Sequence, residues 1–148
     1  FLFKSDFWME AVKVMSFWAS PFRMRVQIGL EEKGVKYVYQ EENVRANKSD
    51  LLLRMNPMHK KIPVLIHNAK PICESLIILQ YIDEAWPTSK PFLPSDLYDR
   101  VLARFWADFI DKKIFDAGSH IIRSKGEAQE EAKRDMVENL EHLEGVLK

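Results

Sequence analysis

Apolar residues recur with two different periods along residues 1–85, and these periods predict alternating strands and helices. Short apolar or alternating runs predict strands over residues 12–17, 37–40, 64–66 and 71–73. Apolar residues three or four positions apart predict helices over 21–33 and 75–84, and a short helix or helical turn within 47–54. The short connection at 68–70 makes the last two strands a hairpin.

The order of these elements is βαβα followed by ββα, which predicts an α/β thioredoxin-like domain. The first half implies a parallel pair of strands, and the hairpin adds antiparallel ones. We assign residues 9–85 to this domain. Residues 1–8 precede the first methionine, and we expect them to be an extra N-terminal segment.

The pattern changes after residues 86–95, which we interpret as a linker because their prolines cannot continue a helix or a central strand. Residues 96–148 have a purely helical pattern, with a wide apolar stripe that is broken near Gly126 and followed by an amphipathic helix. Two helices with apolar faces do not make a good bundle. We therefore expect this all-α C-terminal domain to be incomplete.

Composition excludes several classes of function. The 22 basic and 22 acidic side chains cancel, whereas a nucleic-acid surface needs a basic surplus. No apolar run approaches the length of a membrane-spanning helix. The single cysteine, Cys73, excludes an internal disulfide and a cysteine-rich zinc site, and it fits a reducing compartment such as the cytoplasm. We expect no metal and no cofactor.

Ser20 is the first candidate for chemistry. It precedes Pro21 at the predicted start of a helix, where unpaired N–H groups and the positive end of the helix dipole stabilise an anion. A serine there can donate its hydroxyl to a bound thiolate, which needs help to stay ionised at neutral pH. Serine is also a common helix cap, and on this motif alone capping is the simpler interpretation.

Three further segments of the same α/β half offer groups for a charged ligand. Lys48 and Lys61 can each meet a carboxylate. A proline after Ile62 permits a cis bond, which would turn backbone groups of Ile62 toward a ligand. Glu74 and Ser75 open a helix, where N–H groups suit a carboxylate and the acid suits an ammonium. Taken singly these are turns and caps, but together they suit glutathione, which has two carboxylates, one ammonium and one thiol.

The chain resembles glutathione transferases, and among them the plant tau class. The similarity runs from about Met9 to the end of the chain. It is carried by the stretches Phe17-Trp18-Ala19-Ser20-Pro21-Phe22, Asn47-Lys48-Ser49, Asn56-Pro57, His59-Lys60-Lys61-Ile62-Pro63-Val64-Leu65, Cys73-Glu74-Ser75-Leu76-Ile77, Leu93-Pro94-Ser95-Asp96 and Arg104-Phe105-Trp106-Ala107.

This resemblance implies a role for each candidate. Ser20 corresponds to the catalytic serine that hydrogen-bonds the glutathione sulfur. The resemblance assigns the glycyl carboxylate to Lys48 and Lys61, the cysteinyl part to the backbone of Ile62 before a cis Pro63, and the γ-glutamyl end to Glu74 and Ser75. It places the second substrate, an apolar electrophile, between the two domains near Phe17, Trp18, Phe109 and Lys113.

Two departures from the family pattern accompany these assignments. Ala46 looks like a one-residue insertion before Asn47 and Lys48, and it could shift Lys48. The remaining helices of the family's C-terminal domain are not in the sequence.

The leading hypothesis is a cytoplasmic glutathione transferase that conjugates the thiolate to hydrophobic electrophiles in detoxification and stress response. The resemblance also implies a homodimer, with the helices that begin at Ser75 and Asp96 near the interface. Two alternatives stay open: a non-catalytic carrier of apolar ligands, and an inactive fragment of a transferase. A thiol–disulfide enzyme of this fold, such as a dehydroascorbate reductase, would need a cysteine where Ser20 stands.

Overall fold

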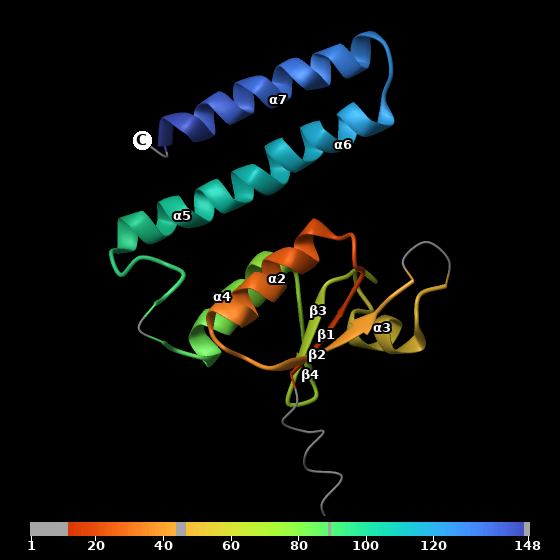
Figure 1. Cartoon of the computed structure of the whole chain (residues 1–148), viewed down its shortest axis with the longest axis vertical. Coiled ribbons are helices and arrows are strands. Elements are labelled where there is room, and N and C mark those ends of the chain that lie inside the picture. The colour runs from red at the N-terminus through yellow and green to blue at the C-terminus, as the bar shows by residue number, and fades with distance from the viewer. Residues whose placement is uncertain (1–11, 44–46, 89, 147–148) are drawn as a thin grey trace, which may run out of the picture. The chain divides into compact units, whose positions relative to one another are not determined.

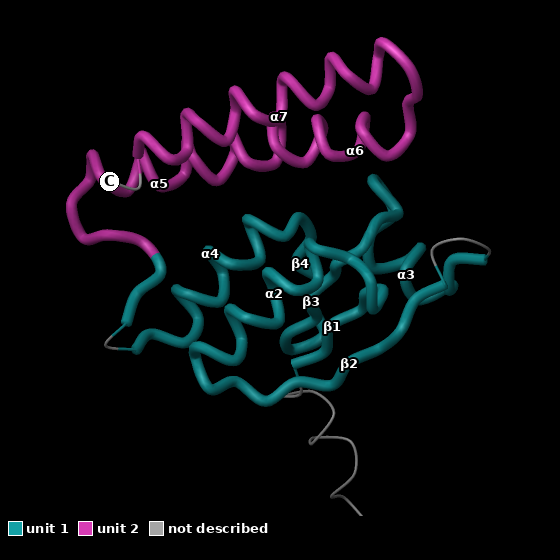
Figure 2. The backbone as a smooth tube through the Cα atoms, turned by 45° about the horizontal axis from the view of Figure 1, so that its top comes forward, with its two compact units in different colours: residues 1–92 teal, residues 93–148 magenta. Residues whose placement is uncertain are grey.

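The computed structural model describes residues 12–43, 47–88 and 90–146. The chain divides into two compact units, Phe1–Phe92 and Leu93–Lys148, which are coloured separately in Figure 2. The predicted extra segment 1–8 and the insertion at Ala46 lie outside the described residues.

In its described residues, the first unit is a four-stranded mixed sheet with three helices (Figure 1). Its elements in chain order are β1 (Val12–Ser16), α2 (Pro21–Glu32), β2 (Tyr37–Glu41), α3 (Asp50–Met55), β3 (Val64–His67), β4 (Lys70–Cys73) and α4 (Ser75–Ala85). The strand order is β2-β1-β3-β4, with β1 and β2 parallel and the other pairs antiparallel. This is the predicted βαβ pair followed by a hairpin.

Alternation along the strands builds two apolar layers, one on each face of the sheet. Val14 and Leu65 belong to the cluster that packs under α2 and α4, whereas Met15 and Val64, their neighbours in sequence, pack against Leu52 of α3. Figure 1 shows α2 and α4 side by side, with α3 on the opposite side of the sheet. The period of two in the strands therefore fixes which helix covers which face.

Capping residues set the ends of the helices. Ser20 caps α2 and Gly34, at a φ of 66°, follows its end, as the sequence predicted. The short helix within 47–54 begins only at Asp50, because Ser49 Oγ accepts the N–H of Leu52 over 3.0 Å and caps it. Phe17 was predicted to end the first strand, but β1 ends at Ser16 and Phe17 begins the turn into α2.

Gly29 lies at the contact between α2 and α4, where there is no room for a side chain. A Cβ at this position would lie 2.5 Å from Leu79 Cδ2. We expect Gly29→Ala to lower the free energy of unfolding by about 1 kcal/mol, because the cost of moving the end of the Leu79 side chain exceeds the gain of alanine over glycine inside a helix. Urea denaturation measures the loss, and Gly145→Ala is the control, because a Cβ there meets nothing within 4 Å. A variant as stable as the parent would contradict this prediction.

The second unit consists of two antiparallel helical runs. The first contains α5 (Leu97–Phe109), a π-helical turn over Ile110–Ile114 and α6 (Phe115–Arg123), and α7 (Glu127–Val146) returns beside it (Figure 1). The predicted break near Gly126 is present, at a φ of 63°. The π turn was not predicted. In the part of the chain that the structure describes, no helix is long and apolar enough to cross a membrane.

Candidate functional site

The strand register brings four separate chain segments to one edge of the sheet. Ser16 at the end of β1 is paired with Glu41 at the end of β2, and Met15 is paired with Val64 at the start of β3. Val64 is in turn paired with Cys73, the last residue of β4. This edge therefore collects the segments that follow β1, β2 and β4 and the segment that precedes β3. All the glutathione-site candidates predicted from the sequence lie in these four segments.

Ser20 lies at the N-terminus of α2 and is 8% exposed. Its Oγ accepts the backbone N–H of Arg23 over 3.3 Å. Because an oxygen lone pair makes this capping bond, the hydroxyl hydrogen remains available to a ligand. The backbone N–H groups of the first turn and the positive end of the helix dipole lie at the same place. Ser20 is thus a cap and a potential donor at once, and the two interpretations of the sequence are compatible.

Ser75 is connected to the same helix through Arg25, which was not among the predicted site residues. Arg25 Nη1 donates to Ser75 Oγ over 2.8 Å, across 50 residues of sequence. A guanidinium can only donate, so Ser75 accepts here and keeps its own hydrogen for another partner. Glu74 beside it is exposed, with a φ of 68°, and makes no side-chain cap bond. A cation one turn into α2 was the only local signal for Arg25.

The segment before β3 is held by a buried amide. Asn56 is 3% exposed, its Nδ2 donates to the carbonyl oxygen of Lys61 over 2.9 Å, and its Oδ1 accepts the N–H of His59 over 3.2 Å. The Ile62–Pro63 peptide bond that follows is cis. The Lys61 side chain is exposed. Asn56 thus anchors the backbone next to both candidates, a role that the Asn-Pro pair in the sequence did not reveal.

Lys48 is exposed, and its neighbour Ser49 is anchored by a buried carboxylate. Glu42, 2% exposed, accepts from Ser49 Oγ over 2.9 Å, from the Ser49 N–H over 3.4 Å and from Gln40 Nε2 over 3.0 Å. These bonds satisfy a charge that would be costly to bury alone. Glu42 was not among the predicted site residues, because a glutamate at a strand end is usually solvated.

Cys73 lies at this edge and is a free, half-buried thiol. Burial and the nearby Glu74 carboxylate raise the pKa of its thiol. A thiol with a raised pKa contains less thiolate at neutral pH and is a weaker nucleophile. Cys73 is therefore better suited to packing than to nucleophilic chemistry.

The candidates for an electrophile site are divided between the two units. Phe17 and Trp18 lie in the first unit with ring centroids 5.8 Å apart, and Trp18 is 68% exposed. Phe109 ends α5 and meets the ring of Trp106 at 5.3 Å, and the exposed Lys113 lies in the π turn. π turns inside helices occur frequently at functional sites.

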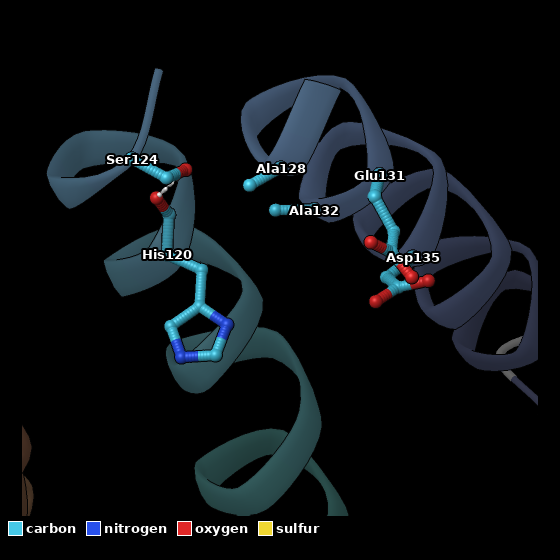
Figure 3. A pocket seen from close by; sticks show the side chains of 6 residues that line it. All are labelled: His120, Ser124, Ala128, Glu131, Ala132 and Asp135. Atoms are coloured by element: carbon cyan, nitrogen blue, oxygen red, sulfur yellow. Dashed lines mark hydrogen bonds between the residues drawn. The ribbon is translucent and has the colours of Figure 1, made fainter. Parts of the chain in front are cut away.

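A cavity of about 460 Å³ lies in the second unit between α6 and α7 (Figure 3). It is lined by His120, Ser124, Ala128, Glu131, Ala132 and Asp135. None of the predicted site residues belongs to it. Within residues 12–43, 47–88 and 90–146, no group of three or more His, Cys, Asp or Glu side chains is placed to hold a metal ion.

Comparisons with known proteins show the family to which the chain belongs. The sequence profile described as "Glutathione S-transferase, N-terminal domain" matches residues 10–84. A probable glutathione S-transferase, parC, from Nicotiana tabacum is 58% identical over 139 residues, which are 93% of this chain and 62% of that protein. Glutathione S-transferase U22 from Arabidopsis thaliana is 56% identical, over 93% of this chain and 63% of its own. The chain thus spans about three fifths of the length of these relatives.

Solved structures give the same result. The tau class glutathione S-transferase from mango, Mangifera indica, superposes with a TM-score of 0.86 at 50% identity, over 91% of this chain and 61% of that one. Rice glutathione S-transferase 1 in complex with glutathione superposes with a TM-score of 0.89 at 48% identity, over 93% and 63%. These superpositions confirm the predicted fold, a thioredoxin-like domain followed by helices. The chain therefore belongs to the glutathione S-transferase family, and its relatives place it in the tau class.

Proposed function

We propose that the edge of the sheet around Ser20 binds glutathione and ionises its thiol, and that the protein conjugates this thiolate to hydrophobic electrophiles. The observation that carries the proposal is the Ser20 hydroxyl: its oxygen accepts the Arg23 N–H, and its hydrogen stays available at the positive end of α2. That hydrogen is the donor that a sulfur anion needs.

The rest of the edge suits the remaining charges of glutathione. Lys48 and Lys61 are exposed cations for the glycyl carboxylate, next to backbone that Glu42 and Asn56 anchor. The backbone of Ile62 would pair with the cysteinyl part. Glu74 and Ser75, at the start of α4, would take the ammonium and carboxylate of the γ-glutamyl end. The rice relative, 48% identical, is a complex with glutathione.

The chemistry then needs no metal and no prosthetic group, because glutathione is a co-substrate. Ser20 donates a hydrogen bond to the sulfur, which lowers the pKa of the thiol, and the proton leaves to water. The thiolate attacks the electrophilic carbon, a carbon–sulfur bond forms, and the leaving group departs with the bonding electrons. Phe17, Trp18, Phe109 and Lys113 are the residues that we propose for the electrophile.

The proposal also includes the cellular compartment and the oligomeric state of the protein. The free thiol of Cys73 supports a reducing compartment, the cytoplasm. A row of exposed apolar side chains on α5, among them Leu97, Val101 and Phe105, supports a homodimer.

The test is the affinity for glutathione as a function of pH, measured by titration calorimetry. If the site prefers the thiolate, the pKa of the bound thiol is lower than that of the free thiol, and affinity rises with pH between the two values. The rise amounts to about tenfold for each unit by which the pKa is lowered. An analogue with a methyl group in place of the thiol should show no rise, and an equal profile for both ligands would refute the proposal.

A turnover assay separates the alternatives. A transferase consumes a model aromatic halide and glutathione together. A non-catalytic carrier binds the apolar ligand with equal affinity with and without glutathione and forms no conjugate. An inactive fragment shows the pH-dependent binding of glutathione without turnover.

A further inference from the structure

The backbone of Trp18 is held on both sides by charged side chains. Its N–H donates to Glu41 Oε1 over 3.2 Å, and its carbonyl oxygen accepts from Arg23 Nη1 over 3.3 Å. Glu41 is the last residue of β2, and Arg23 lies in the first turn of α2. Both peptide groups of a residue two positions before Ser20 are therefore fixed by side chains from neighbouring elements.

Tyr39 joins these two side chains to each other. Its hydroxyl donates to the Glu41 carboxylate and lies 3.4 Å from the carbonyl oxygen of Ser16. Its ring lies under the Arg23 guanidinium, with the central carbon 4.5 Å from the ring centroid. We call Glu41, Tyr39 and Arg23 the Trp18 bracket.

The Tyr39 hydrogen bond of the Trp18 bracket persists at neutral pH. Burial, followed by the hydrogen bond to Glu41, raises the pKa of Tyr39 to about 12, so its hydroxyl stays protonated and keeps donating. The acid of Glu41 and the cation of Arg23 have opposite signs, so the bracket adds little net charge near Ser20. Its effect on a bound thiol must come mainly from position.

Position matters because Ser20 follows a short exposed turn. Trp18 and Ala19 are exposed, and turns of this kind are mobile unless they are tied down. Arg23 also donates its backbone N–H to Ser20 Oγ, so one residue holds both the turn and the hydroxyl. A displacement of about 1 Å at a reacting group costs up to about 100-fold in rate.

We propose that Glu41 and Arg23 are positioning residues: by holding the Trp18 peptide, they place the Ser20 hydroxyl against the sulfur of glutathione. This inference rests on the proposed function, because it needs a thiol bound at Ser20. Neither side chain touches glutathione in this scheme. Their removal should therefore affect the ionisation of the thiol and leave the rest of the ligand bound.

The experiment measures glutathione affinity from about pH 5.5 to about pH 9 for the 148-residue chain and its variants, across the range in which thiols titrate. Glu41→Ala and Arg23→Ala should bind like the parent at low pH, where the thiol is protonated in every case. Their rise in affinity with pH should be about tenfold smaller, which corresponds to one unit of thiol pKa. Glu41→Gln should keep the parent profile, because its amide oxygen still accepts the Trp18 N–H. Glu32→Ala, an exposed carboxylate at the end of α2, is the matched control.

Each other outcome overturns the inference. Affinity reduced by the same factor at every pH would show a purely structural role, and an unchanged profile in both alanine variants would show no role. A Glu41→Gln variant as impaired as Glu41→Ala would show that the hydrogen bond is irrelevant. A flat profile in the parent chain would refute the proposed function itself, and this inference with it. Thermal melts of each variant confirm that the folded protein is compared.

Discussion

Replacement of Ser20 by alanine is expected to slow conjugation of glutathione by about 100-fold or more. A rate decrease of this size is typical when one preorganised hydrogen-bond donor to an anion is removed from an active site. The pKa of the bound thiol should return toward its free value, so the rise in glutathione affinity with pH should disappear. Affinity at low pH should stay close to that of the parent, because the other charges of glutathione keep their partners.

The same substitution removes a helix cap, which costs about 1 kcal/mol of stability and must be separated from catalysis. Ser20→Thr keeps both the cap and the hydroxyl, and it should retain most of the activity. Asp96→Ala removes another cap, in which Asp96 Oδ1 accepts from the N–H groups of Tyr98 and Asp99, and it should leave glutathione binding unchanged. Full conjugation by Ser20→Ala in an intact relative and in this chain would show that the serine is only a cap.

Replacement of Lys33 by alanine is expected to lower the free energy of unfolding of the first unit by about 3 kcal/mol. The Lys33 side chain is 1% exposed, and its Nζ lies 2.6 Å from Asp83 Oδ1. It also donates to the Thr88 hydroxyl and the Lys90 carbonyl oxygen, and it lies 4.5 Å from the ring centroid of Phe92. Without it, this ion pair with a carboxylate that is only 14% exposed is broken, and breaking a buried ion pair costs about 3–5 kcal/mol.

Hydrogen exchange of the β1 and β3 amides measures this loss in the first unit alone. Lys36→Ala removes an exposed lysine from the same connection and serves as the control. The double variant Lys33→Met with Asp83→Leu should recover part of the stability, because an apolar pair often replaces a buried ion pair without cost. A decrease in the free energy of unfolding of less than about 1 kcal/mol for Lys33→Ala would contradict this prediction, because exposed ion pairs on a surface contribute that little.

Local signals explain why much of the first unit was predictable. Each of these signals acts within a few residues: the short apolar run of Val12, Val14 and Met15, the Ser20 cap and the stop at Gly34. The candidate residues at the sheet edge were identified because they stand at the ends of such elements. The parallel pair and the hairpin were predicted, but the antiparallel pairing of β1 with β3, which joins them into one sheet and brings the four segments to one edge, was not.

The connections between elements were not predictable in the same way. Two contacts join helical segments about 50 residues apart: the hydrogen bond from Arg25 to Ser75 and the ion pair between Lys33 and Asp83. Neither contact produces a periodic pattern in the sequence. The π turn at Ile110–Ile114 was missed because one extra residue in a turn leaves an apolar stripe nearly intact. Glu41 and Glu42 look like two solvated acids, yet one is exposed and the other is buried with three bonds.

The bonds between Glu42 and Ser49 make the connection after β2 tolerant of changes in length. They tie the two ends of this connection together, so we expect Ser49, and with it the backbone next to Lys48, to keep its position when the number of residues between them changes, provided that they still span the two ends. The entropy of closing a loop grows slowly, by about 0.6 kcal/mol for each doubling of its length. Natural insertions and deletions between these two residues should therefore accumulate more readily than within β1, where one added residue would exchange the two faces of the sheet.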